Sequence, residues 1–375
     1  MEKVRPKVIV FTTAYHPFIG GAEIAIQETV RRLRDTFEFY VITHRIRRVL
    51  PQKEIFEGAT VIRLGFGTKL DRFFLFPFLA GFRALRLLEG PTLLWGVMVS
   101  YASIGAYFAK LLRPHVPFVL TLQEGDSESH LISGKLGLIG MWWKALLKSA
   151  DKVTVISTYL RAFAKQRSYR GETILIPNGV DIEKFKVQSE KLKVKGGRII
   201  ITTSRLVDKN GVDILIRAIA EVRKKISGIR CHIIGDGEER ESLETLVGEL
   251  GLQREVKFFG SVPHEQIPLY LRDADVFVRA SRSEGMGNSF IEALAADLPI
   301  IGTAVGGIPD IIEDGKTGLF TGVDDPNDLA EKIVRLLTDV DLADTIVREG
   351  QRKIAGRFEW HIIAQQYKDV FEHLL

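Results

Sequence analysis

Residues 281–310 constrain the fold of this chain more than any other stretch, because they alternate between the patterns of loop, helix and strand. An apolar run at 276–278 leads into a loop that Gly285 and Gly287 loosen. Apolar residues then recur at helical spacing, which predicts a helix that begins near Asn288 and buries one face. A second apolar run and a glycine turn follow it. This order of strand, loop, helix and strand is typical of an α/β fold.

The start of this helix is a predicted binding site for phosphate. Unpaired backbone N–H groups at a helix N-terminus point along the axis and carry partial positive charge, so they hold a phosphate group without any lysine. The residues that would surround the phosphate are Gly285, Met286, Gly287, Asn288 and Ser289.

Two acids, Glu284 and Glu292, bracket this loop. Glu292 stands three residues after Ser289, which fits a capping box in which the glutamate only bonds back to the helix start. The alternative is that Glu292 accepts hydrogen bonds from the hydroxyls of a ribose. Glu284 would repel a phosphate at the helix end unless it faces another group, such as the hydroxyls of a sugar.

The two glutamates, with seven residues between them and with Pro299 and Gly306-Gly307 after them, resemble the donor-site signature of family 4 retaining glycosyltransferases. Further motifs stand in that family's order and approximate spacing, at 176–181, 204–207, 235–237, 259–260 and 314–318. The resemblance covers nearly the whole chain, firmly from about residue 151 onward. It implies the GT-B architecture, an α/β fold of two Rossmann-like doubly wound domains that face a cleft.

Two cations follow the expected strand at 198–203 and are candidate ligands for a diphosphate. Ligands of doubly wound sheets bind at the carboxyl ends of the strands. Arg205 could grip a diphosphate with its bidentate fork, and Lys209 could add a point charge. Relatives more often place the lysine five residues after the arginine, where this chain has Asn210. We therefore assign Lys209 to the site together with Asn210, with a solvated loop lysine as the alternative.

The resemblance implies further contacts with the nucleotide-sugar. Gly235 belongs to a Gly-Asp-Gly turn, and Val262 ends a segment whose backbone faces the base in the family. Gly20 and Gly21 match the N-terminal glycine loop, which approaches the diphosphate from across the cleft.

Two residues of the N-terminal half are candidates for contact with the acceptor or the transferred sugar. His16 precedes the glycine loop. Gln123 follows the strand at 118–122, where many relatives have a histidine near the reacting carbon. A glutamine there could act only as a neutral hydrogen-bonding group.

The domain organisation follows from the same resemblance and from composition. We expect an acceptor-binding domain over 1–190, with a polar linker between about 185 and 195. A domain that binds the nucleotide-sugar follows over 191–358. A last helix, 359–375, is expected to pack back on the first domain.

Charge is unevenly divided between these halves. Residues 1–190 contain 27 Lys and Arg against 17 Asp and Glu, a net charge of +10, and the remainder contains 25 against 30, a net charge of −5. Aromatic residues lie among the cations at 72–86 and 142–148, a pattern that could rest on an anionic membrane surface or a lipid-linked acceptor. The alternative is helices that pack their aromatics inward. No motif for nucleic-acid binding accompanies the charge.

No charged residue occurs between Glu89 and Lys110, a span long enough to cross a bilayer. Polar and helix-breaking residues dilute it, so we expect a buried strand near 93–99 and then a helix over 101–112. No signal peptide is expected before the first strand, which predicts a cytoplasmic protein, with peripheral contact on the inner face of the membrane as an option. Cys231 is the single cysteine, which excludes an intramolecular disulfide.

We expect no metal and no cofactor, because the nucleotide-sugar is a substrate. Asp273 and Asp275 are spaced like a metal-chelating pair, but they stand at a helix end and a turn. The expected activity is transfer of a hexosyl unit to a hydroxyl of a lipid-linked, small glycoside or polyol acceptor, with Arg205, Lys209 and Glu284 as catalytic residues. Retention at the anomeric carbon is implied by the family.

Three other functions remain open at this stage. A GT-B sugar-nucleotide epimerase would turn over without an acceptor, and it is the strongest alternative. A nicotinamide dehydrogenase would need a complete glycine fingerprint after its first strand, which residues 13–21 do not supply. A non-catalytic module that binds nucleotide-sugars would form no product.

Overall fold

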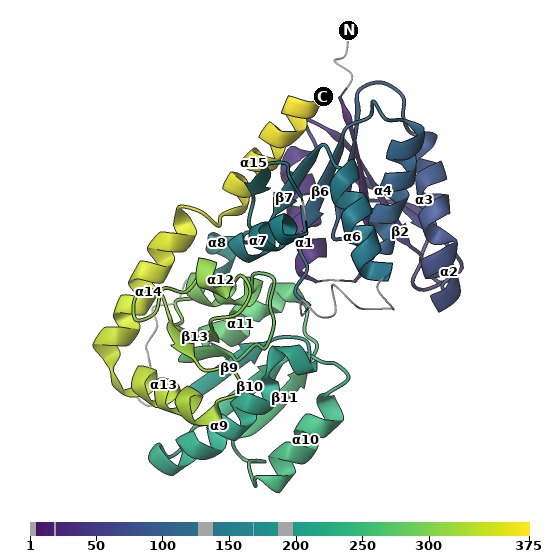
Figure 1. Ribbon diagram of the computed structural model, residues 1–375. Helices are drawn as coiled ribbons and strands as arrows, with labels where there is room; N and C mark the ends of the chain where they lie inside the picture. Colours follow the sequence, from purple (N-terminus) through teal and green to yellow (C-terminus); the bar gives the residue numbers. More distant parts are fainter. Residues whose placement is uncertain (1–4, 19, 127–137, 168, 187–197) are drawn as a thin grey trace. The chain divides into compact units, whose positions relative to one another are not determined.

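The computed structural model describes residues 5–18, 20–126, 138–167, 169–186 and 198–375, and it divides into two compact units (Figure 1). Of the described residues, unit 1 contains those up to 124, those from 138 to 178, and 360–375. Unit 2 contains 125–126 and 179–359.

The boundary at 178/179 differs from the expected boundary at residue 190. The backbone N–H of Val180 donates to the carbonyl of Phe358 at 2.7 Å, and the short helix α8 (Ile182–Phe185) packs against α12 (Asn288–Ala295). These contacts tie residues 179–186 to unit 2. Most of the expected linker, between about 185 and 195, falls within residues 187–197, which lie outside the described residues.

Unit 1 is built on an eight-stranded sheet in the order β3-β4-β2-β1-β5-β6-β7-β8. All neighbours are parallel except β3 and β4. The strands are β1 (Lys7–Thr12), β2 (Glu38–His44), β3 (Lys53–Phe56), β4 (Ala59–Leu64), β5 (Thr92–Val97), β6 (Phe118–Leu122), β7 (Lys152–Val155) and β8 (Thr173–Leu175). Every residue of β5 and β6 is buried, as in a parallel sheet covered on both faces.

The helices of unit 1 cover the two faces of this sheet. They are α1 (Gly21–Leu33), α2 (Lys69–Phe74), α3 (Phe76–Leu85), α4 (Tyr101–Leu112), α6 (Leu138–Ser149), α7 (Thr158–Gln166) and α15 (Trp360–Leu374). Figure 1 shows α2, α3, α4 and α6 as one layer, and their contacts follow that order.

The last helix, α15, packs beside α1 and completes the core of unit 1. Its residues Tyr367 and Phe371 are buried, with ring centroids 5.0 and 5.3 Å from that of Trp95 on β5. The unit therefore takes its core from both ends of the chain.

The uncharged span between Glu89 and Lys110 forms β5 and most of α4, which confirms the expected strand and helix. No helix in the described part of the chain is both long and apolar enough to span a bilayer.

Unit 2 is built on a six-stranded parallel sheet in the order β11-β10-β9-β12-β13-β14. The strands are β9 (Ile199–Thr203), β10 (Arg230–Ile234), β11 (Val256–Gly260), β12 (Val276–Arg279), β13 (Ile300–Thr303) and β14 (Leu319–Thr321). Along the chain, β10 and β11 are added on one side of β9, and β12, β13 and β14 are then added on its other side. The order thus reverses between β9 and β12, which makes this pair the topological switch point of a doubly wound sheet.

Branched apolar residues of the strands pack against the helices of unit 2 to form its core. Besides α8 and α12, these helices are η1 (Asp208–Asn210), α9 (Val212–Lys225), α10 (Arg240–Glu249), η2 (His264–Gln266), α11 (Ile267–Arg272), η3 (Ile308–Asp310), α13 (Pro326–Thr338) and α14 (Val340–Ala355). α13 begins at Pro326. The carboxylate of Asp325 accepts from the backbone N–H groups of Asn327 and Asp328 and caps it there.

Candidate functional site

The switch point of unit 2 brings together the loops that follow β9 and β12. Arg282 joins them, since its guanidinium bonds both carboxylate oxygens of Asp213 at 2.8 and 3.0 Å and the carbonyl of Asp208 at 2.6 Å. A further bond reaches Asp324 at 2.7 Å. The hydrogen bonds to Asp213 raise the pKa of Arg282 above its ordinary value, so the guanidinium remains charged and links the two loops.

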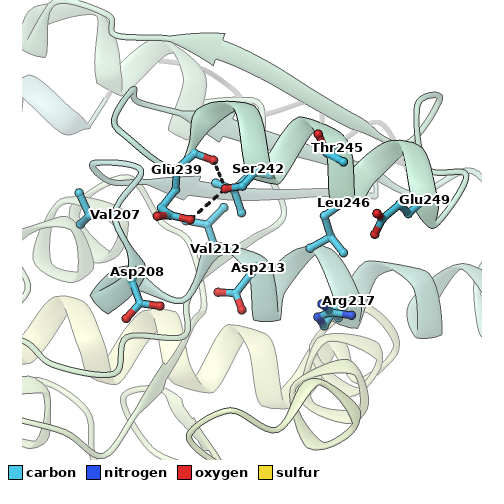
Figure 2. A pocket seen from close by; sticks show the side chains of 11 residues that line it. Val207, Asp208, Val212, Asp213, Arg217, Glu239, Ser242, Thr245, Leu246 and Glu249 are labelled. Atoms are coloured by element: carbon cyan, nitrogen blue, oxygen red, sulfur yellow. Dashed lines mark hydrogen bonds between the residues drawn. The ribbon is translucent and has the colours of Figure 1, made fainter.

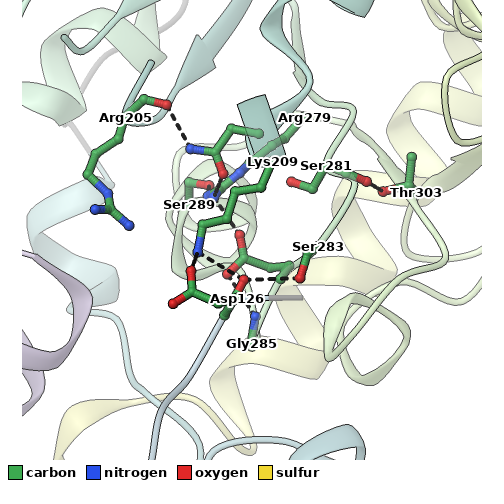
Figure 3. A network of polar contacts seen from close by, with 12 residues as sticks. Asp126, Arg205, Lys209, Arg279, Ser281, Ser283, Gly285, Ser289 and Thr303 are labelled. Carbon is green, nitrogen blue, oxygen red and sulfur yellow. Dashed lines mark hydrogen bonds and ion pairs between the residues drawn. The ribbon is translucent and has the colours of Figure 1, made fainter. Parts of the chain in front are cut away.

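Arg205 lies in the loop after β9 with an exposed side chain. Among the described residues its guanidinium makes no hydrogen bond or ion pair, and Figure 3 shows it pointing away from the polar network. Its carbonyl accepts a hydrogen bond from the side-chain amide of Asn210 at 2.7 Å. Arg205 is therefore held by its backbone while its charged group remains available.

Lys209 is more constrained than Arg205. Its ammonium donates to the carbonyl of Gly125 at 2.9 Å and to the carboxylate of Asp126 at 2.7 Å (Figure 3). Gly125 and Asp126 follow β6 in the chain but belong to unit 2. Of the three N–H groups of the ammonium, two are used within the described residues, which leaves one for a ligand.

Arg279, the last residue of β12, is the centre of the network, and sequence reasoning did not single it out. Its guanidinium donates to Asn210 Oδ1 at 2.9 Å and to Ser289 Oγ at 3.0 Å, and it forms an ion pair with Glu284. Only 12% of its side chain is exposed. Its Nε–H is buried and has no partner within the described residues, and such a group is costly unless a ligand satisfies it.

Glu284 is thus paired with a cation, an arrangement that the sequence pattern did not predict. Its other carboxylate oxygen accepts from the N–H of Gly285 at 3.0 Å. Its carbonyl lies against Gly306, where an added Cβ would come within 1.7 Å of the oxygen. Gly306 also has a φ of +54°, so only glycine fits beneath this loop.

The helix α12 begins at Asn288, as the sequence predicted, with Gly287 as its N-cap at a φ of +91°. No side chain caps it, so its first N–H groups have no side-chain partner from the cap residue. Met286 and Ser289 are buried beside this end. The backbone arrangement expected for a phosphate site is present.

The capping-box alternative for Glu292 is wrong. Instead of bonding back to the helix start, its carboxylate contacts His264 Nε2 at 2.8 Å. His264 lies in η2, just after the half-buried Val262. Because 28 residues separate the histidine from the glutamate, no local pattern could have paired them.

Gly235, which follows β10, lies beside the loop after β9, because its Cα faces the carbonyl of Ser204 in that loop. Its N–H donates to the carbonyl of Gly260 at the end of β11 at 2.8 Å. The aspartate pair has structural partners. Asp275 accepts from the N–H of Ile199 at 2.8 Å at the start of β9, and Asp273 pairs with Arg272.

The remaining predicted residues belong to unit 1. Gly20 is the N-cap of α1, and Gly21 is its first residue. His16 is half-buried and stacks on Phe56, with ring centroids 3.8 Å apart. Gln123 is buried at the end of β6, where its Oε1 accepts from Asn178 at 3.4 Å.

A separate pocket of about 360 Å³ opens between α9 and α10 (Figure 2). Its lining contains four acids and a single cation, Arg217: the acids are Asp208, Asp213, Glu239 and Glu249. A phosphate would be repelled there, and no predicted site residue lines this pocket. The cation-rich loops at the switch point are the better candidate site for an anionic ligand.

Two doubly wound units, the second with cations and a helix start without a side-chain cap at its switch point, define the GT-B class of glycosyltransferases. Residues 183–353 match the family model described as glycosyl transferases group 1, and residues 19–184 match that of glycosyltransferase family 4. The chain belongs to this glycosyltransferase family, whose two halves the models describe.

Individual relatives agree with this assignment. An uncharacterized glycosyltransferase of Methanocaldococcus jannaschii is 25% identical over 98% of both chains. A GDP-mannose-dependent alpha-(1-6)-phosphatidylinositol monomannoside mannosyltransferase of Mycobacterium tuberculosis is 30% identical over 58% of this chain and 61% of its own length. The solved structure of sucrose-phosphate synthase from Thermosynechococcus elongatus has the same fold, with a TM-score of 0.85, 24% identity and 99% coverage of both chains.

Proposed function

We propose that the chain transfers a hexosyl unit from a nucleotide-diphosphate sugar to a hydroxyl acceptor, with retention and without a metal ion. The observation that carries this proposal is the pairing of cations with the uncapped start of α12 at the switch point of unit 2. The name of the mycobacterial relative, a GDP-mannose-dependent enzyme, supports a donor of this kind.

The diphosphate would be held by three cations and one helix end. Arg205 has an exposed guanidinium suited to a bidentate contact, and Lys209 retains one N–H. Arg279 adds its unpartnered Nε–H in place of the lysine that relatives have five residues after the arginine. Asn210 occupies that position and instead orients Arg279. Together they would stabilise the charge of the departing diphosphate.

The two glutamates would hold hydroxyl groups. Glu284, oriented by Arg279, would accept from the sugar, and Glu292, oriented by His264, would accept from the ribose. Because both carboxylates are already paired, neither is suited to act as a covalent nucleophile. We propose instead that the bond between the anomeric carbon and the acceptor oxygen forms on the face from which the phosphate departs, and that the phosphate takes the acceptor's proton.

The acceptor that we favour is lipid-linked. The mycobacterial relative described above is named for the acceptor phosphatidylinositol monomannoside. A small glycoside or polyol is the other acceptor class that the proposal allows.

The test of the donor site is thermal unfolding with a panel of nucleoside diphosphates and their sugar conjugates, because a ligand that binds only the folded state raises the unfolding temperature. We expect one base to give the largest shift. Arg205→Ala should abolish the shift for diphosphate and conjugate alike, and Glu284→Gln should remove only the additional shift due to the sugar. Arg217→Ala is the matched control, because it removes a cation from the acidic pocket of Figure 2.

If the shift survives Arg205→Ala and disappears in Arg217→Ala, the ligand binds in the acidic pocket of Figure 2, and the proposal is contradicted. With the donor known, NMR of the product reports the anomeric configuration, and activity in excess EDTA tests for metal dependence. Conversion of the donor without any acceptor would favour the epimerase instead.

A further inference from the structure

The outer surface of α2 and α3 in unit 1 carries a stripe of apolar side chains. Leu70, Phe74, Phe78 and Phe82 follow one another at intervals of four residues, and they are 73%, 72%, 59% and 57% exposed. Leu75, between the two helices, keeps right-handed helical angles, so the periodicity continues across the junction. Side chains four residues apart lie on one face of a helix, so these four form a continuous stripe.

The neighbouring helices widen this surface (Figure 1). The ring of Phe78 stacks on that of Phe108 in α4, with centroids 4.7 Å apart, and Phe108 lies 6.3 Å from Trp142 in α6. At the end of α4, Leu111 and Leu112 are 61% and 59% exposed. We call the stripe and these two leucines the apolar face. Exposed patches of this kind mark binding surfaces, since ordinary surfaces expose large apolar side chains singly.

The exposed charges on the four helices of this layer have one sign. The four helices of the layer contain one acid, Asp71, which is buried in the capping box of α2. Cations surround the face, and the guanidinium of Arg86 lies 4.5 Å from the ring centroid of Phe82. On α6, Lys144 and Lys148 are exposed. An exposed apolar row on helices that carry cations and no exposed acid complements a surface that is apolar inside and anionic outside.

We infer that the apolar face binds the surface of a membrane that contains anionic phospholipids. The phenylalanine rings enter the headgroup region, and the lysines and arginines contact the lipid phosphates. The binding requires neither a nucleotide-sugar nor an acceptor, so it does not depend on the proposed function.

The test is sedimentation of the full-length protein with sucrose-loaded vesicles of phosphatidylcholine, with and without phosphatidylglycerol. We expect binding to the anionic vesicles alone. Phe74→Ser with Phe78→Ser should weaken it by at least about tenfold, since the burial of two rings is lost. Leu269→Ser with Val340→Ser is the matched control, because these residues are 49% and 65% exposed in unit 2.

The charge contribution is tested with Lys144→Gln and Lys148→Gln, each of which should weaken binding about fivefold at low salt. The control is Lys224→Gln with Lys225→Gln, exposed on α9 of unit 2. Equal binding by the wild type and the phenylalanine variant would overturn the inference. So would self-association that the phenylalanine variant abolishes without any vesicle binding, because a second copy would then cover the apolar face.

Discussion

The ion pair between Arg279 and Glu284 makes a quantitative prediction about the stability of unit 2. Only 12% and 15% of the two side chains are exposed, so Arg279→Met leaves a poorly hydrated carboxylate without its cation. It also removes the donors to Asn210 and Ser289. We expect a loss of about 3 kcal/mol, the low end for breaking a buried pair, because both groups keep some access to water.

The double variant separates the pair from its surroundings. Glu284→Gln should cost about 1.5 kcal/mol, since the amide oxygen can still accept from Gly285. If the two side chains act on each other, Arg279→Met combined with Glu284→Gln should cost about 3 kcal/mol, against the roughly 4.5 kcal/mol expected for independent residues. The coupling energy would then be about 1.5 kcal/mol.

Urea unfolding offers an internal control for this measurement. All four tryptophans, at positions 95, 142, 143 and 360, belong to unit 1, so their fluorescence follows that unit. Circular dichroism follows the helices of both units. The variants should shift the circular dichroism transition of unit 2, and a cycle additive to within about 0.5 kcal/mol would refute the argued coupling.

Three further predictions concern single positions. Gly306→Ala should abolish the thermal response to nucleotides, because its Cβ would meet the carbonyl of Glu284 at 1.7 Å. The control Gly315→Ala should retain the response, since Gly315 also has a positive φ, +72°, but has no atom within 4 Å of an added Cβ. Loss of the response in both variants would point to backbone strain alone. Burial lowers the pKa of His44, so the unfolded state binds the proton first and the stability of unit 1 should fall as the pH drops below about 6.5. His44→Gln should weaken that dependence, and an unchanged profile in urea unfolding would assign it to other groups. Phe371→Ala should cost about 3 to 4 kcal/mol in the fluorescence transition, and a shift confined to unit 2 would contradict the placement of α15.

The elements around the switch point could be predicted because their signals are local. Buried parallel strands are runs of apolar residues, and Gly287, just before the apolar residues at helical spacing in α12, marks a helix start. The run from β5 to α4 could be distinguished from a membrane helix because its polar and helix-breaking residues divide it.

The pairings of side chains could not be predicted, because they join residues that only the sheet order brings together. Arg279 meets Asn210 across 69 positions, and His264 meets Glu292 across 28. A glutamate three residues after a serine looks the same in sequence whether it caps its own helix or faces a histidine on another element. One signal was present, namely an arginine at the end of a buried strand five residues before Glu284.

The domain boundary was placed too late for a related reason. The polar stretch interpreted as the linker begins only near residue 185, so residues 179–184 were assigned to the first domain, but a hydrogen bond from Val180 to Phe358 and the packing of α8 attach residues 179–186 to unit 2. The segment of 125–126 joins unit 2 through Lys209, which composition alone does not reveal.

The position of α15 in the core of unit 1 has a consequence for biosynthesis. Ribosomes make the chain from its N-terminus, so all of unit 2 is synthesised before the residues that cover Trp95. Domains of nascent chains usually fold in the order of their synthesis. Here all strands of unit 1 are made before those of unit 2, but unit 2 is the first to have its whole chain, because unit 1 lacks α15 until Tyr367 and Phe371 are released. During that interval the nascent chain presents a surface that chaperones recognise.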